Sequence, residues 1–244
     1  MSVEARPAFY ALARGGWRDY VTLLHPPYTL WHLSYVVIGA SLAPEWRPGR
    51  LIATLVAFFL AVGIGAHSLD ELHGRPLSTQ IPGRLLGALA ACSIAAAVGI
   101  GVAGAVDHDL WLLVFVAAGA FVVYAYNLEL LGGRLHGDLW FAGAWGAFPL
   151  LTAYFAAAGR VRWEAVLAGG FAALSSYTQR RLSTPMRRLR RRVVSVSGAL
   201  ELTDGTREVV TRETLLAGSE GALRALAAAH VVLAVALVVL RVNQ

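Results

Sequence analysis

Residues 51–77 read LIATLVAFFLAVGIGAHSLDELHGRPL, an apolar part followed by a charged part. Its first part, 51–68, contains no Asp, Glu, Lys or Arg. This apolar run is close to the length of about 20 residues that a helix needs to cross about 30 Å of hydrocarbon. Charged residues begin at Asp70 and continue to Arg75. The stretch therefore predicts a transmembrane helix that reaches a polar membrane surface at these residues.

Apolar runs of this kind recur along the 244-residue chain. Seven of them predict membrane spans, at 27–43, 51–68, 85–106, 110–128, 139–159, 165–177 and 225–240. The composition agrees, because 57% of the residues are hydrophobic and 15% are charged, against about 25% charged in soluble proteins. A single Cys excludes a disulfide framework and a cysteine zinc site. The sequence thus predicts an all-α, polytopic transmembrane bundle of about seven helices.

Two segments are expected to lie outside the membrane. Residues 1–25 carry charges without an early apolar core, so they are predicted to form a cytoplasmic lead-in with an amphipathic helix over 9–24. Residues 26–244 form the transmembrane domain. Within it, 179–221 is predicted as an Arg-rich cytoplasmic loop, in which 193–210 alternates weakly and contains Asp204-Gly205. This pattern predicts a small β-hairpin.

The distribution of arginine predicts the orientation of the chain. With the N-terminus in the cytoplasm, 16 of the 21 Arg fall on the cytoplasmic side and 5 on the other, as the positive-inside rule requires. We therefore expect an integral protein of a bacterial plasma membrane. The arginines between 180 and 192 are expected to contact anionic lipid headgroups or a phosphorylated ligand. Nucleic acid is not expected as a partner, because no module that reads it accompanies the charge.

The end of the helix over 51–77 holds the first candidate site. If the helix continues, His67, Asp70 and Glu71 share one face. This face would offer an imidazole and two carboxylates to a cation or a proton. Asp70 and Glu71 together with phosphate oxygens suit magnesium, whereas His67 would favour a transition metal. The alternative is a solvated helix end at which Asp70 pairs with Arg75.

At this segment the chain resembles the UbiA superfamily of intramembrane prenyltransferases. The second helix of that family ends in Asn-Asp-x-x-Asp-x-x-x-Asp, followed by a basic residue, Pro and an apolar residue. Here Asp70 aligns with the middle Asp, whereas His67 and Gly74 replace the other two. The downstream residues Arg75-Pro76-Leu77 match the family pattern. The resemblance implies that Asp70 is the one surviving carboxylate of the family's three. Together with Glu71 on the same helix face, and with His67 and Arg75 nearby, it would form a reduced magnesium site on a diphosphate.

A second stretch carries the same resemblance. Residues 124–131, Arg134 and 137–149 resemble the family's fourth helix, basic loop and fifth helix in order and spacing. In the family, a Tyr near the helix end and the basic loop residue lie by the diphosphate and the aromatic acceptor. The resemblance therefore implies that Tyr126, Asn127 and Arg134 bind substrate.

The family is built from two helical repeats, which implies a pseudo-repeat of helices 1–4 and 5–7 here. The Arg-x-Leu-Ser-Thr of 75–79 returns at 180–184, so Arg180 and Arg181 join the implied substrate-binding residues. The carboxylates expected on the second repeat are replaced by Ser175 and Ser176. Asp204 and Glu208 are an alternative source of that second cluster. Helices eight and nine of the family have no counterpart.

Three function classes follow from these patterns. The first is a prenyltransferase-like enzyme with a reduced magnesium site, which transfers a prenyl group from an isoprenyl diphosphate to an aromatic or lipid acceptor. The second is a non-catalytic relative that binds a polyprenyl or quinone-like lipid, as a partner subunit or a homo-oligomer. The third is a small transporter in which His67, Asp70 and Glu71 relay protons. The sequence leaves all three open.

Overall fold

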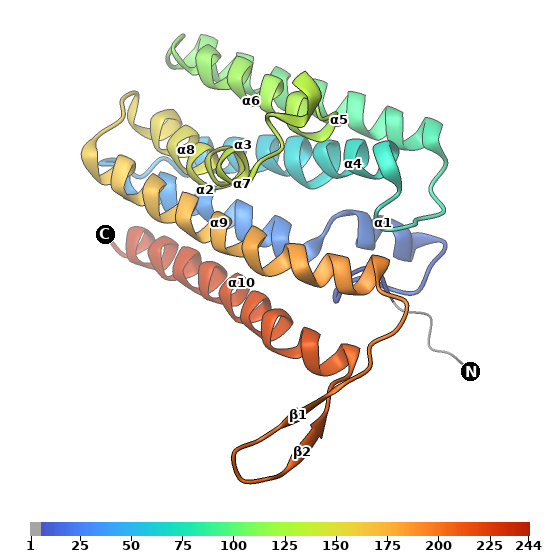
Figure 1. The fold of residues 1–244 in the computed structure, drawn as a ribbon. Coiled ribbons are helices and arrows are strands. Elements are labelled where there is room, and N and C mark those ends of the chain that lie inside the picture. Colours follow the sequence, from blue (N-terminus) through green and yellow to red (C-terminus); the bar gives the residue numbers. More distant parts are fainter. Residues whose placement is uncertain (1–5) are drawn as a thin grey trace.

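The computed structural model describes residues 6–244, and α-helices dominate it (Figure 1). The helices are α1 Trp17–Leu23, α2 Pro26–Leu42, α3 Pro48–Phe58, α4 His67–Gly74, α5 Gly83–Asp107, α6 Leu112–Asn127, α7 Asp138–Ala142, α8 Phe148–Ala158, α9 Trp163–Arg192 and α10 Arg212–Val242. Two π-helical turns, η1 Phe59–Ala66 and η3 Gly143–Ala147, join α3 to α4 and α7 to α8, and a 3₁₀ turn, η2 Leu131–Gly133, precedes α7. The predicted all-α bundle is confirmed.

Within residues 6–244, four helices are long and apolar enough to cross a membrane: Pro48–Gly74, Gly83–Asp107, Asp138–Ala158 and Arg212–Val242. Three of them contain the predicted spans 51–68, 85–106 and 225–240, and Asp138–Ala158 covers all of the predicted span 139–159 except Gly159. The predicted span at 110–128 corresponds to the shorter apolar helix α6. The other two predicted spans lie in α2, which has 17 residues, and in α9, whose second half is rich in arginine.

Helix α2 lies at the centre of the bundle, between α10 on one side and α3 and α8 on the other. Its side chains Trp31, Tyr35 and Val36 have no solvent exposure. Two glycines permit close helix contacts: a Cβ on Gly39 would lie 2.1 Å from the Leu150 carbonyl oxygen, and one on Gly146 would lie 2.4 Å from that of Ala172. Small residues that let backbones approach in this way are typical of helices packed in lipid.

The arginine-rich segment differs from the prediction. Helix α9 continues to Arg192 and α10 begins at Arg212, so the predicted loop over 179–221 is reduced to 193–211. Arginine is a good helix former, and α10 begins with a capping box between Thr211 and Thr214. The arginines from Arg180 to Arg192 therefore belong to α9 and not to a loop. The helix sets the direction of each arginine side chain.

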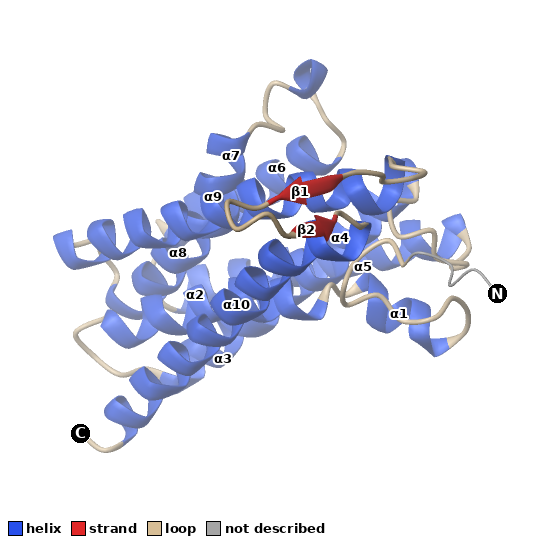
Figure 2. Cartoon of the chain, turned by 60° about the horizontal axis from the view of Figure 1, so that its bottom comes forward, coloured by secondary structure: helices blue, strands red, loops and turns tan. Residues whose placement is uncertain are grey.

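The structure also locates the N-terminal segment and the predicted hairpin. The predicted lead-in helix over 9–24 is wrong in extent, since only Trp17–Leu23 is helical and 6–16 is an irregular segment. The predicted hairpin is confirmed: β1 Ala199–Glu201 pairs antiparallel with β2 Arg207–Val209 around Asp204-Gly205. Figure 1 shows the hairpin extending away from the bundle beyond α9 and α10, and Figure 2 shows it near the ends of these helices.

Candidate functional site

A cavity of about 390 Å³ lies where α4 and α6 end and the arginine-rich half of α9 passes. Residues 7–10 of the irregular N-terminal segment line it as well. Phe9 and Tyr10 pack edge-on against the Tyr28 ring, with ring centroids 6.0 and 5.5 Å apart. The cavity thus has a polar helical wall and an aromatic cover.

The two predicted carboxylates separate at this cavity. Asp70 lines it, but Glu71 does not, because adjacent residues of a helix point in directions about 100° apart. Glu71 is fully buried. Its carboxylate accepts hydrogen bonds from the Leu77 amide at 2.9 Å, the Thr79 amide at 2.8 Å and the Thr79 hydroxyl at 2.9 Å. Glu71 therefore fixes the segment after α4, and the predicted pair of metal carboxylates is not formed.

This geometry bears on the implied magnesium. Within residues 6–244, no group of three or more His, Cys, Asp or Glu side chains is placed to hold a metal ion. Magnesium in phosphate sites is held by one or two carboxylates together with phosphate oxygens. Of the predicted pair, only Asp70 lines the cavity. The described residues therefore do not fit the two-carboxylate site that the sequence implied.

Two histidines stack beside Asp70. The His67 and His25 rings are parallel, with centroids 4.0 Å apart, and His67 Nδ1 lies 3.2 Å from the Gly63 carbonyl oxygen. Burial, and after it the neighbouring His67, holds the pKa of His25 well below its ordinary value. His25 is therefore neutral at pH 7 and offers a hydrogen bond without a charge.

Several buried polar atoms in the cavity wall lack partners. They include His25 Nε2, both ring nitrogens of His32, and Gln179 Oε1. His32 and Gln179 are neighbours, yet none of these atoms meets hydrogen-bond geometry with a described residue. Both side chains are more than nine-tenths buried, at 6% and 3% exposure. Because buried polar atoms are almost always satisfied, these atoms indicate a ligand or water in the cavity.

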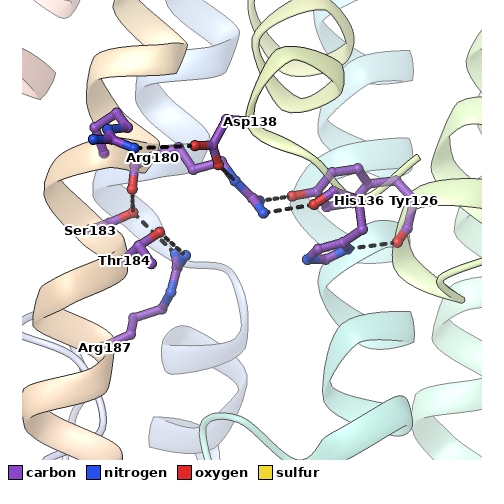
Figure 3. A network of polar contacts seen from close by, with 8 residues as sticks. Tyr126, His136, Asp138, Arg180, Ser183, Thr184 and Arg187 are labelled. Atoms are coloured by element: carbon purple, nitrogen blue, oxygen red, sulfur yellow. Dashed lines mark hydrogen bonds and ion pairs between the residues drawn. The ribbon is translucent and has the colours of Figure 1, made fainter. Parts of the chain in front are cut away.

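Arg180, which also lines the cavity, is the centre of a polar network (Figure 3). Its Nε donates to Asp138 Oδ1 at 2.6 Å, one terminal nitrogen donates to the His136 carbonyl oxygen at 2.8 Å, and the other donates to the Tyr126 hydroxyl. The Tyr126 ring stacks on His136, with centroids 4.3 Å apart. Arg180 therefore ties α9 to the end of α6 and the start of α7, and Asp138 offsets its charge.

Arg187 and Arg191 differ from Arg180 in having no carboxylate partner among the described residues. Arg187 donates to the Ser183 and Thr184 hydroxyls, both at 3.1 Å. Arg191 donates to the Pro7 carbonyl oxygen at 3.3 Å. Both line the cavity that holds Asp70. Asp70 interacts electrostatically with both guanidinium groups, but it forms no ion pair with either among the described residues, so both groups can still contact an anion.

The structure places the predicted site residues in two groups. His67, Asp70, Tyr126, Asn127 and Arg180 line the cavity. Glu71, Arg75, Arg134 and Arg181 do not. Arg75 instead donates to the carbonyl oxygens of Thr79 at 3.3 Å and Ile81 at 2.6 Å. The alternative in which Asp70 pairs with Arg75 is therefore wrong. Arg75 and Glu71 both form hydrogen bonds with the segment that follows α4.

Sequence reasoning missed part of the cavity wall. The sequence analysis did not predict that the cavity is lined by His25, His32, Gln179 and residues 7–10. His32 lies inside the predicted span 27–43, whereas Gln179 follows the predicted span 165–177 and stands between Thr178 and Arg180. Polar residues inside membrane helices are costly and usually functional, and this signal would have identified His32 but not Gln179.

A lysine at position 180 tests whether the three-way contact of Arg180 matters. We expect Arg180→Lys to lower the free energy of unfolding by about 1–3 kcal/mol, because an ammonium cannot reproduce the planar fork that reaches three acceptors. Thermal unfolding of the purified protein in detergent measures this loss. Arg181→Lys is the matched control, since Arg181 is mostly exposed and lies 3.8 Å from Asp138. Equal stability of the two variants would show that the Arg180 network contributes nothing.

Comparison of the chain with protein-family models, with curated proteins and with solved structures gives no match. The function is therefore inferred from the cavity, where the described residues provide two guanidinium groups without an ion-pair partner, one carboxylate and several buried polar atoms without a hydrogen-bond partner.

Proposed function

We propose that this is a membrane protein whose cavity binds the head group of an isoprenyl diphosphate or a similar phosphorylated lipid. The observation that carries the proposal is the pair Arg187 and Arg191, which face the cavity without carboxylate partners among the described residues. Guanidinium groups bind phosphate oxygens in a fixed, bidentate geometry. His32 and Gln179 supply uncharged polar atoms on the same wall.

The kinship with the UbiA superfamily is part of this proposal. It is supported by the position of Asp70, Tyr126 and Arg180 around one cavity, as the resemblance implies. The excess of arginine at this end supports a cytoplasmic cavity and a cytoplasmic N-terminus. A proton relay through His67, Asp70 and Glu71 has less support, because the Glu71 carboxylate is bonded to the segment after α4 and does not line the cavity.

Prenyl transfer is a second candidate, favoured by the presence of Asp70 beside the arginines. In this reaction the bond between the allylic carbon and the diphosphate oxygen breaks, and the diphosphate leaves with the electron pair. A new bond then forms to the acceptor, which releases a proton. Arg187 and Arg191 would stabilise the negative charge that develops on the leaving group. The neutral His25 ring and the His67 ring stacked on it would lie close to that group.

Binding in the presence of a chelator tests the proposal. Farnesyl diphosphate should bind the purified protein in lipid nanodiscs equally well with magnesium and with excess EDTA, because arginine rather than metal neutralises the phosphate. Asp70→Asn should bind the same ligand several-fold more tightly, since it removes a like charge near the phosphate. Isothermal titration calorimetry measures both results.

The opposite pair of results would overturn the arginine-based site. If EDTA abolishes binding and Asp70→Asn weakens it, a metal held by Asp70 carries the phosphate. Release of diphosphate in the presence of aromatic acceptors, measured with an enzyme-coupled assay, would add the transfer reaction. Absence of release with retained binding would leave a lipid-binding protein.

A further inference from the structure

An irregular segment near the N-terminus covers the polar cavity. Residues 6–10, which we call the lid, belong to no helix or strand, and all of them except the first line the cavity. Among the described residues, two hydrogen bonds join the backbone of the lid to α9. Arg190 donates to the Arg6 carbonyl oxygen at 3.2 Å, and Arg191 Nε donates to that of Pro7 at 3.3 Å. The lid is therefore bound to the same helix that carries the proposed phosphate-binding arginines.

The chain directly after the lid is held more firmly than the lid itself. Ala11 has an exposure of 1%. The Leu12 amide donates to the Thr22 hydroxyl at 3.0 Å, and the Gly15 amide donates to the Asp19 carboxylate at 2.9 Å. By contrast, both hydrogen bonds between the lid and α9 are exposed to water. Irregular segments held by exposed hydrogen bonds open at low cost, so the lid can open while the residues after it stay in place.

Tyr10 places a hydroxyl group among the charges of the cavity. It lines the cavity and interacts electrostatically with Arg187, Arg191 and Asp70. Burial raises the pKa of Tyr10, so its hydroxyl keeps the proton at pH 7. A protonated phenol can donate a hydrogen bond to a phosphate oxygen. The lid thus brings one further donor to the place where the two arginines would bind an anion.

Arg191 can hold the lid and an anion at the same time. Its bond to the Pro7 carbonyl oxygen uses one of the five N–H groups of the guanidinium. A phosphate group that binds the terminal nitrogens of Arg191 therefore does not have to displace the lid. An anion between Arg191 and Tyr10 would instead add a contact that is present only when the lid is closed.

We propose that the lid closes over the bound phosphorylated head group and that the Tyr10 hydroxyl contacts this group directly. The inference rests on the proposed function and adds a moving part to it. The lid opens and closes in the free protein, and the head group stabilises the closed form by joining Tyr10 to Arg187 and Arg191. By linkage, the factor by which Tyr10 tightens binding equals the factor by which the ligand suppresses opening. The competing interpretation is a static cover.

Removal of the Tyr10 hydroxyl tests the contact. Tyr10→Phe keeps the ring, which packs edge-on against the Tyr28 ring. In lipid nanodiscs it should bind farnesyl diphosphate about tenfold more weakly than the native protein, the usual effect of losing one hydrogen bond to a charged group. Isothermal titration calorimetry measures the change. Tyr20→Phe is the matched control, because Tyr20 is 42% exposed on α1 and does not line the cavity.

The reactivity of a thiol on the lid tests the motion. Ala8 is 8% exposed, so in Ala8→Cys/Cys92→Ala a maleimide reaches the single thiol when the lid opens. Saturating farnesyl diphosphate should slow this labelling about tenfold, and additional Tyr10→Phe should remove most of the protection. Ser197→Cys/Cys92→Ala is the control, because Ser197 is exposed and lies outside the lid. Hydrogen exchange of the amides of residues 8–10 gives the same readout in the native protein.

The outcomes separate this inference from the proposed function. If farnesyl diphosphate does not bind the native protein, both are overturned. If it binds, but labelling at position 8 is unchanged, the proposed function stands and the lid is a static cover, whether or not Tyr10→Phe weakens binding. Faster labelling with ligand would also overturn the inference, because the ligand would then displace the lid. Equal factors in the affinity and labelling experiments would establish it.

Discussion

Replacement of Glu71 by Ala is expected to destabilise the protein by about 3–5 kcal/mol. The Glu71 carboxylate accepts three hydrogen bonds from Leu77 and Thr79, and it has no exposure to solvent. Alanine would leave two buried amides and a hydroxyl without partners. Each unsatisfied buried donor costs about 1–3 kcal/mol. Thermal unfolding of the purified protein in detergent, followed by intrinsic fluorescence, measures the loss.

The control for this prediction is the neighbouring residue. Asp70→Ala removes the same charge from the adjacent position, but Asp70 accepts no hydrogen bond from the described residues and should lose little stability. The deficit of Glu71→Ala should be equal with magnesium and with EDTA, because the carboxylate holds backbone rather than metal. A Glu71→Ala variant that is as stable as the native protein, or that loses stability only when magnesium is present, would contradict the assignment.

The different positions of Asp70 and Glu71 show what the sequence could predict at this site and what it could not. The apolar run over 51–68 and the charges after it were sufficient to predict a membrane helix and its polar end. The assumption that Glu71 shares a face with His67 was reasonable for an isolated helix, in which i and i+4 are neighbours. The segment 75–81 folds back onto α4 and captures Glu71. Tertiary contacts of this kind leave no periodic signal.

The arginines of α9 show a second limit. Their number predicted the orientation and a phosphorylated ligand, but composition alone did not distinguish Arg180 and Arg190 from Arg187 and Arg191. The first two have acidic partners, Asp138 and Glu220, both at 2.6 Å. These partners come from residues 42 and 30 positions away along the chain. Only the fold shows which positive charges are offset and which remain for a ligand.

Replacement of both Arg187 and Arg191 has the largest expected effect on ligand binding. The double variant Arg187→Gln/Arg191→Gln should bind farnesyl diphosphate about 100-fold more weakly than the native protein, with each single variant losing about tenfold. Hydrogen bonds between charged groups contribute about 1.5–3 kcal/mol each, and 1.4 kcal/mol is a factor of ten. Thermal stability should change little, because among the described residues both guanidinium groups donate hydrogen bonds only to uncharged acceptors that are partly accessible to water.

A matched control separates the site from a general attraction between positive protein and negative ligand. Arg188→Gln/Arg207→Gln removes the same charge, yet both residues are exposed and neither lines the cavity. It should bind within a factor of about two of the native protein, whereas a surface-charge effect would weaken both double variants equally. Raising the ionic strength strengthens the comparison, since salt screens exposed charges more than those inside a cavity. Equal losses at high salt would show that Arg187 and Arg191 do not form a phosphate site, and a selective loss would place the head group between them and Asp70.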